Sequence, residues 1–184
     1  MELVKLCLNV GAVKAEEVPV SKLEFQPELR ELCSQNACGR YARNYTCPPY
    51  IGDVSKLIDE LRTFKKAVVW QNIYPLEDSF DFEGMMSARQ RHNAMSLDIA
   101  SRIYAEFGRK DALVLAAGGC SLCEICAVCT DSPCRYPDSA LSSLEAYGIN
   151  VSKICEVSGM RYINGVNTVT YFSGAFWRPA AIHL

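Results

Sequence analysis

The residues best able to do chemistry in this chain are its cysteines, and half of the ten lie close together. These five are Cys120, Cys123, Cys126, Cys129 and Cys134. The first four are separated by two residues each, so successive thiolates surround one centre while the backbone amides between them point toward it. An iron–sulfur cube needs this arrangement, because it takes one thiolate per iron and its sulfides accept hydrogen bonds. The run therefore predicts a [4Fe-4S] cluster.

Two other chemistries fit the same run less well. Structural zinc sites usually take their four ligands as two separated pairs, and cysteines crowded at two-residue spacing are unusual for them. Disulfides or unliganded thiols are the third alternative. A bacterial ferredoxin run reads C-x2-C-x2-C-x3-C-P, whereas here Cys126 is followed by Cys129 at x2 and by Cys134 at x7. The run therefore matches ferredoxin chemistry and not the ferredoxin fold.

A second cysteine group lies upstream, in a predicted loop closed by two prolines. It comprises Cys33, Cys38 and Cys47. In one interpretation these three hold a second cluster with Cys129 as the candidate fourth ligand. The first cluster is then held by Cys120, Cys123, Cys126 and Cys134. In the other interpretation both groups surround one shared site and Cys129 is incidental. We favour two clusters, because eight cysteines in two groups suffice for two cubes. Cys7 and Cys155, in apolar-patterned segments, are predicted to be buried and inert.

The composition limits which classes of protein this chain can belong to. With 184 residues, 49% of them hydrophobic, the chain can bury a core, and we expect one domain over residues 1–184. A net charge of −2 without a basic run argues against a nucleic-acid partner. There is no apolar stretch of the ~18 residues that a membrane span needs, and no signal-peptide pattern at the N-terminus. We therefore expect a cytoplasmic protein whose clustered cysteines bind metal rather than form disulfides, and an anaerobic host. Nothing in the sequence indicates an oligomeric state.

The cysteine run must be positioned by the elements around it. An apolar strand at 112–117 leads directly to Cys120, and strand ends are usual places for sites in α/β folds. The longest predicted helix, 84–107, precedes that strand. Further elements are strands within 1–25 and at 67–74, 150–157, 160–163 and 166–172, and helices at 26–33, 53–64 and 138–148. Asn164-Gly165 predicts a hairpin turn between the last two strands. Pro19 indicates an edge strand. The expected fold class is α/β, a single-domain mixed sheet flanked by helices, with cysteine-rich cluster loops at strand ends.

A few polar residues near the cysteines have two interpretations. Arg135, directly after a candidate ligand, either offsets cluster charge or is an ordinary surface arginine. Arg40, Arg43 and Tyr45 either form an anion or substrate pocket or belong to a solvated loop. Glu145 has capping-box spacing from Ser142, inside the predicted helix.

Neither histidine is predicted as a ligand. His92 lies in a charged stretch of the long helix and is expected at the surface, and His183 is expected to be frayed at the C-terminus. The chain has no nucleotide-binding motif and no zinc-protease motif. Catalytic residues are therefore not predicted, and whether the chain is an enzyme stays open.

Several of these motifs together resemble a known family. They are Cys120-x2-Cys123-x2-Cys126-x7-Cys134-Arg135-x-Pro137, Ser143-Leu144-Glu145-Ala146-x-Gly148, and upstream Cys38-x2-Tyr41 with Cys47-Pro48-Pro49. The chain resembles a family of predicted metal-binding proteins, a domain of unknown function found mainly in anaerobic bacteria and archaea. The resemblance spans nearly the whole chain and implies metal binding through these cysteines. It implies no reaction, and Cys129 is where variation is expected.

Three functions are consistent with these observations. The first is one-electron transfer to or from a partner redox enzyme through one or two [4Fe-4S] clusters. The second is an enzyme whose cluster has an iron without a cysteine ligand, open to substrate, as the three upstream cysteines suggest. The third is a zinc-stabilised module for protein interaction. The first is favoured.

Overall fold

A computed structural model describes residues 2–178, so the position predicted for His183 lies outside the described residues. In chain order the helices and strands are α1 (Leu3–Val10), β1 (Lys14–Pro19), η1 (Val20–Lys22), α2 (Leu29–Ser34), α3 (Val54–Arg62), β2 (Lys66–Pro75), α4 (Phe82–Phe107), β3 (Ala112–Leu115), η2 (Ala127–Thr130), η3 (Glu145–Tyr147), α5 (Val151–Ser158) and β4 (Thr168–Trp177), where η denotes a 3-10 helix. No helix within residues 2–178 is long and apolar enough to cross a membrane.

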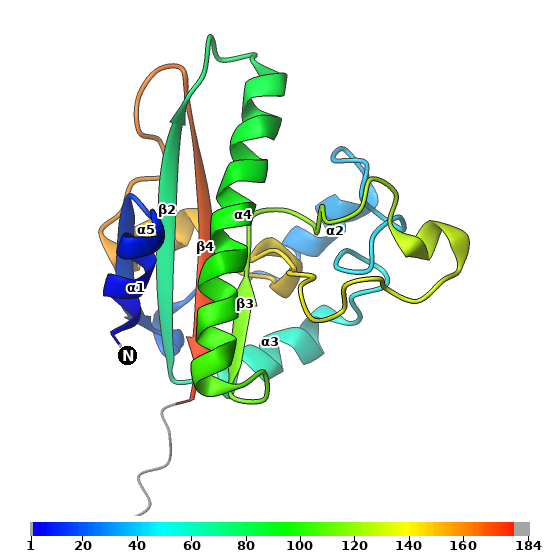
Figure 1. Cartoon of the computed structure of the whole chain (residues 1–184), viewed down its shortest axis with the longest axis horizontal. Coiled ribbons are helices and arrows are strands. Elements are labelled where there is room, and N and C mark those ends of the chain that lie inside the picture. Colours follow the sequence, from blue (N-terminus) through cyan, green and yellow to red (C-terminus); the bar gives the residue numbers. More distant parts are fainter. Residues whose placement is uncertain (1, 179–184) are drawn as a thin grey trace, which may run out of the picture.

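The predicted α/β class is confirmed, and the strands form one sheet in the order β1-β2-β4-β3. All three strand pairs are antiparallel, so the sheet is antiparallel and not mixed as expected. The strand β2 pairs with β4 along its whole length, from Lys66 opposite Trp177 to Pro75 opposite Thr168. The strand β1 lies at an edge and ends at Pro19, as predicted. The strand β3 is the opposite edge, and both cysteine-rich loops extend from that side of the molecule (Figure 1).

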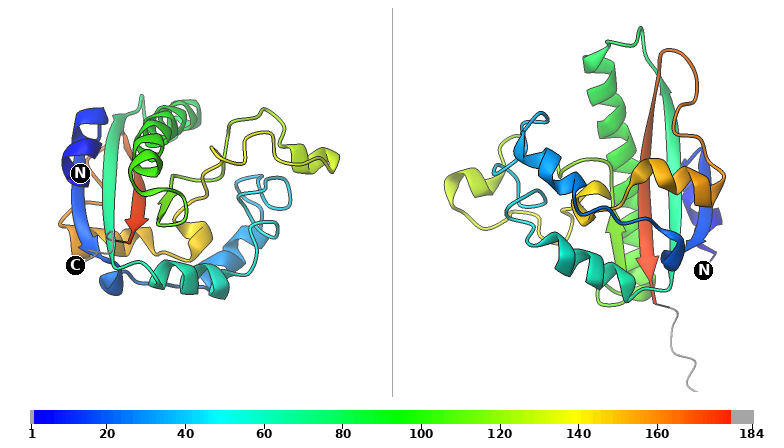
Figure 2. Two further views of the ribbon diagram at one scale, coloured as in Figure 1. Left: turned by 60° about the horizontal axis from the view of Figure 1, so that its bottom comes forward. Right: turned by 180° about the vertical axis from the view of Figure 1, so that it is seen from behind.

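Helices cover both faces of the sheet, so the molecule has two apolar layers. Because side chains alternate along a strand, Trp70 of β2 packs toward α1 and α4, whereas Val69 packs toward the opposite layer. Figure 2 shows α1 and α4 on one face and α3 and α5 on the other. In α4, Ile99 and Ile103 are fully buried, as the predicted helical repeat requires. The helix ends at Gly108, its predicted stop.

Several predicted elements are wrong. Residues 3–10 are helical, because Leu3 and Cys7 are four apart and both bury against the sheet. Residues 151–158 form a helix and not a strand, because the side chain of Asn150 accepts hydrogen bonds from the amides of Ser152 and Lys153 and caps it. The short helix predicted over 26–33 forms as α2, but it has no buried residue.

The two predicted elements on either side of α5 also differ. In place of a helix over 138–148 there is only the single turn η3, ending at Gly148 with positive φ. The amide of Ala116 donates to the carbonyl of Ser142 at 2.8 Å, so this segment runs along the end of β3 instead of coiling. Residues 160–163 form no strand, because β4 pairs with β2 and β3 and not with the segment before the Asn164-Gly165 turn.

Candidate metal centre

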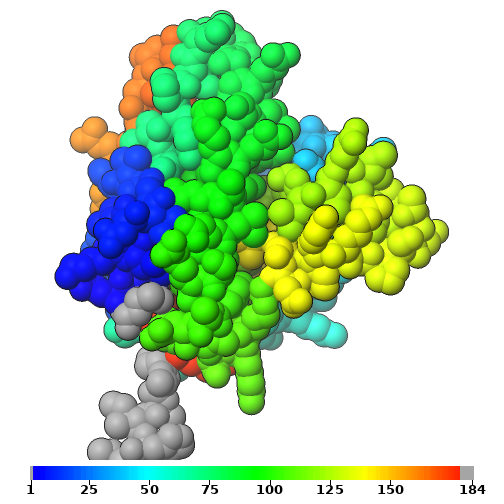
Figure 3. All heavy atoms as spheres, in the orientation of Figure 1, coloured from blue at the N-terminus to red at the C-terminus, as the bar shows by residue number. Residues whose placement is uncertain are grey.

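Four of the five clustered cysteines line one pocket just beyond β3. They are Cys120, Cys123, Cys126 and Cys134. The opposite side of the pocket comes from the upstream loop, through Asn44, Tyr45 and Thr46. In the space-filling view the segment that carries the four cysteines projects from the sheet and helices as a separate lobe (Figure 3). Residues far apart in sequence therefore form this pocket, and its thiols all come from one loop.

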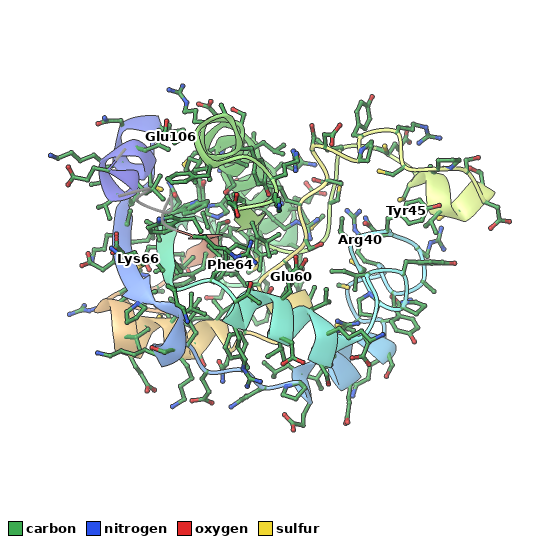
Figure 4. All side chains as sticks on the ribbon, turned by 90° about the horizontal axis from the view of Figure 1, so that it is seen from below. Arg40, Tyr45, Glu60, Phe64, Lys66 and Glu106 are labelled. Atoms are coloured by element: carbon green, nitrogen blue, oxygen red, sulfur yellow. The ribbon has the colours of Figure 1, made fainter. Side chains whose placement is uncertain are left out.

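The upstream loop holds the backbone of Cys120 on both sides. Arg40 Nη1 and Asn44 Nδ2 donate to the carbonyl of Cys120, at 3.0 and 2.7 Å. The amide of Cys120 donates to Thr46 Oγ1 at 2.9 Å. The side chain of Tyr45 reaches the same lobe further out, where its hydroxyl donates to the carbonyl of Ser132 at 2.8 Å. Figure 4 shows Arg40 and Tyr45 between the two loops. These side chains join the two loops, and Asn44, Tyr45 and Thr46 also line the pocket.

The strand end before Cys120 is held from the other side by α4. The side-chain amide of Asn93 donates to the carbonyl of Ala117 at 2.9 Å and accepts from its amide at 3.2 Å. An asparagine side chain thus continues the hydrogen bonding of the strand for one more residue. The backbone that leads into Cys120 is therefore held in place by these hydrogen bonds from α4.

The electrostatics of the pocket favour a bound cation. Burial raises the pKa of the Cys120 thiol, and the thiolates of Cys134, Cys123 and Cys126 raise it further. The backbone amide of Leu122 acts in the opposite direction by donating to the Cys120 sulfur. A bound metal supplies the positive charge that desolvated, mutually repelling thiolates lack, and metal binding releases their protons. The amide between Cys120 and Cys123 is thus directed as the sequence predicted.

The upstream cysteines form a second group. Burial raises the pKa of Cys47 to about 11, and the nearby thiols of Cys38 and Cys33 act in the same direction. Burial also raises the pKa of Cys33, to which Cys38 again contributes. Cys33 and Cys47 are partly buried and Cys38 is exposed. The three thiols therefore influence one another electrostatically, but the structure of residues 2–178 does not bring them together as a set that could hold an ion.

The two groups adjoin at one glycine. A Cβ atom on Gly119 would lie 2.6 Å from Cys47 Sγ, so the sulfur rests on the bare backbone directly before Cys120. Only glycine leaves room for this approach, although its φ is one that any residue can adopt. Cys47 thus touches the backbone of the downstream run.

Cys129, the candidate fourth ligand of the upstream group, lies apart from the pocket. It is exposed in η2, and its thiol donates a weak hydrogen bond to the carbonyl of Arg43 at 3.6 Å. Arg135 is also exposed, and its guanidinium donates to the carbonyl of Ile125 at 3.0 Å. That bond joins two parts of the cysteine lobe. Of the remaining cysteines, Cys7 is fully buried, as predicted, and Cys155 is half-buried.

The prediction of a surface histidine is wrong. His92 is fully buried between α4 and the sheet, where its Nε2 lies 2.8 Å from the hydroxyl of Ser173. Burial lowers its pKa to about 4, so the ring is neutral at pH 7. Ser96, four residues later on α4, bonds to the same hydroxyl and accepts from the indole of Trp70. Residues 92, 96, 99 and 103 share one helix face, and that spacing was the sequence signal for burial.

A family comparison bears directly on these cysteines. Residues 16–176 match the family model described as predicted metal-binding protein (DUF2284). The chain belongs to this family. No curated protein and no solved structure matches the chain. The matched range includes both cysteine groups and nearly the whole sheet, from Glu16 in β1 to Phe176 in β4, so the family assignment applies to the fold and the candidate site together.

The donors fit the metal that this family implies. Four sulfurs lining one pocket suit a thiophilic metal such as zinc or iron in a cluster. The pocket has a free volume of about 20 Å³, room for about one water molecule. This volume is closer to that of a single ion than to that of a cube. Within residues 2–178 no three His, Cys, Asp or Glu side chains are already arranged to hold an ion, so the fit is one of donor type and not of geometry.

Proposed function

We propose that this chain is an iron–sulfur protein that passes single electrons between a donor and a partner redox enzyme. In this proposal one [4Fe-4S] cluster is held by Cys120, Cys123, Cys126 and Cys134. The observation that carries the proposal is that these four cysteines line one pocket while the intervening Leu122 amide donates to the Cys120 sulfur. An iron–sulfur cube takes four thiolates, and its potential depends on hydrogen bonds to sulfur.

The surroundings of the pocket support electron transfer to a protein partner. Leu122, Ile125 and Tyr136 belong to the cysteine lobe, and all three are exposed. Leu122 and Tyr136 also line the pocket, so apolar surface is available next to the proposed cluster. A redox partner that docks here approaches the cluster closely without passing through the sheet.

The upstream group is proposed to hold the second cluster. Cys33, Cys38 and Cys47 act on one another electrostatically, and together they would provide three of the four ligands that a cube needs. Contact between Cys47 and Gly119 brings this group beside the first. Two adjoining clusters suit a protein that relays electrons between two partners.

A zinc-stabilised interaction module is the second candidate, and one observation favours it. The free volume of the pocket, about 20 Å³, is closer to the size of a single ion than to that of a cube. An enzyme that binds substrate at an open iron has less support, because Arg40 and Tyr45 are occupied by hydrogen bonds between the loops.

The test is to measure metal and acid-labile sulfide in anaerobically purified protein, with absorbance and EPR spectra before and after dithionite. About eight irons with matching sulfide and a bleachable brown chromophore are expected, at four irons per cube. About four irons would leave one cube and reject the second. Zinc without sulfide would reject the electron-transfer proposal and favour the interaction module.

A further inference from the structure

A further cavity lies between η1 and the C-terminal end of α3. Its volume is about 290 Å³, close to the lower end of the range of about 300–1,000 Å³ that is typical of small-molecule sites. None of the residues that line it lines the cysteine pocket. The cavity is therefore distinct from the proposed metal centre.

The inner wall of this cavity is apolar and well packed. It is formed by Val20, Leu23 and Phe64, which are 2, 7 and 4% exposed. The ring of Phe64 packs against that of Phe176, with centroids 6.5 Å apart, and the guanidinium of Arg178 lies 4.7 Å from its centre. An apolar group that enters the cavity therefore contacts side chains that the core already holds, so little ordering entropy opposes its binding.

The two chain segments that form the cavity are held together by backbone hydrogen bonds. The amide of Val20 donates to the carbonyl of Lys65 at 3.2 Å, and the amide of Leu23 donates to the carbonyl of Val20 at 3.0 Å. Pro19, directly before η1, lies opposite Lys66 in the pairing of β1 with β2. The cavity is therefore preformed, as small-molecule sites usually are.

The rim of the cavity is positively charged. Arg62 and Lys65 both line it, and no acidic residue does. The guanidinium of Arg62 lies 5.4 Å from the centre of the Phe25 ring, which also lines the cavity. Within residues 2–178, Arg62 has one ion pair, with Asp59 at 3.5 Å between two exposed side chains, and such pairs are weak. The ammonium group of Lys65 has no ion pair or hydrogen bond within the same residues, so the rim has positive charge available for a bound anion.

We propose that this cavity binds a small organic carboxylate with an apolar body. The apolar body contacts the inner wall, and the carboxylate stays at the rim, where Arg62 and Lys65 bind it. A guanidinium pairs with a carboxylate through two parallel hydrogen bonds, and an ammonium group adds a point charge. The hydroxyl of Ser21 lines the same cavity, has no partner within residues 2–178, and can donate a further hydrogen bond to the carboxylate. Inorganic phosphate, which has no apolar group, leaves the inner wall in contact with water.

The experiment is a titration of the full-length protein with benzoate, followed by two-dimensional ¹H–¹⁵N NMR. We expect saturable shifts of the amide signals of residues 20–25 and 62–65, with a dissociation constant of about 1–10 mM for a ligand of so few atoms. Two further probes separate the contributions of charge and apolar contact. Phosphate, which lacks the apolar body, and benzyl alcohol, which lacks the charge, are each expected to bind at least about tenfold more weakly than benzoate.

Two adjacent lysines provide a matched pair of variants. Lys65→Gln and Lys66→Gln each remove one exposed positive charge, but Lys66 does not line the cavity and pairs with Glu17 at 2.7 Å. Lys65→Gln is expected to weaken benzoate binding by about threefold, as is Arg62→Gln, whereas Lys66→Gln leaves it unchanged. The proposal is overturned if benzoate causes no saturable shift, if phosphate or benzyl alcohol binds as tightly as benzoate, or if the two lysine variants lose affinity equally. None of these results depends on the metal content of the protein, so they do not bear on the proposed electron transfer.

Discussion

Replacing Gly119 by alanine tests whether the two cysteine groups adjoin as described. The added Cβ would lie 2.6 Å from Cys47 Sγ, about 1 Å inside the ordinary contact distance of ~3.5–4.0 Å. Its other neighbours, Thr46 Oγ1 at 3.7 Å and Asn44 Nδ2 at 3.8 Å, are in ordinary contact. The backbone at Gly119 is not in the left-handed region, so the substitution adds no backbone strain. The effect of the substitution is therefore limited to the steric conflict between the new methyl group and Cys47 Sγ.

The protein can respond to Gly119→Ala in two ways, and both displace the sulfur of Cys47. Either the two loops move apart, which costs about 1–3 kcal/mol as in an overpacked core, or the Cys47 side chain adopts an unfavourable conformation, which costs about 0.5–1.5 kcal/mol. We expect the free energy of unfolding of the metal-free protein to fall by about 1–2 kcal/mol in urea titrations. After anaerobic reconstitution we expect the proposed upstream site to lose metal, because the added methyl group displaces the sulfur of Cys47, one of its three proposed ligands.

Gly174→Ala is the matched control. An added Cβ at this β4 position meets its nearest atoms at 3.5 Å, in ordinary contact, and its φ also lies outside the left-handed region. We expect a change in stability within about 1 kcal/mol and full metal content. If Gly119→Ala and Gly174→Ala behave alike in both measurements, Cys47 is not packed on Gly119, and the account of the adjoining groups is refuted.

Two further predictions follow from burial and from pocket geometry. The folded-state pKa of His92, about 4, lies below its ordinary value of 6.5, so stability is lost as the pH falls from 6.5 toward 4, by about 3 kcal/mol in total. The measurement is the unfolding free energy of the wild type minus that of His92→Gln, determined across this pH range. Tyr74 and Tyr171, whose pKa values burial raises, do not ionise there. A difference that does not change with pH would contradict the prediction. At the pocket, Cys134→Ser should weaken metal binding by more than about tenfold, whereas Cys129→Ser should leave it unchanged, as measured by competition with a chelator. Equal losses in these two variants would show that Cys129 is a ligand.

Local patterns in the sequence predicted the elements that deliver the cysteines. The apolar run after residue 112 forms β3, and its end leads into the cysteine lobe. The side chain of Asp53 caps α3 as expected, by accepting from the amides of Ser55 and Lys56. These features depend on neighbouring residues alone, and propensity and capping rules therefore suffice for them.

The errors occur where distant pairing decides the structure. The Asn164-Gly165 turn lacks a hairpin because β2, far upstream, already pairs with β4 from Lys66 to Pro75. The segment before η3 is not helical because Ser142 gives its carbonyl to Ala116, at the end of β3. No local pattern records such partners.

The hydrogen bonds around Cys120 explain why this site uses a larger body than a short cysteine run requires. The peptide groups of Ala117 are held by Asn93 from α4, and those of Cys120 by Asn44 and Thr46 from the upstream loop. The backbone of Cys120, a proposed ligand, is therefore held on both sides, while the lobe that follows it projects from the sheet and helices. The loop that holds it also carries Cys47, whose sulfur rests on Gly119, so a displacement of the upstream loop acts on the backbone directly before Cys120. Packing between residues far apart in sequence thus couples the two cysteine groups.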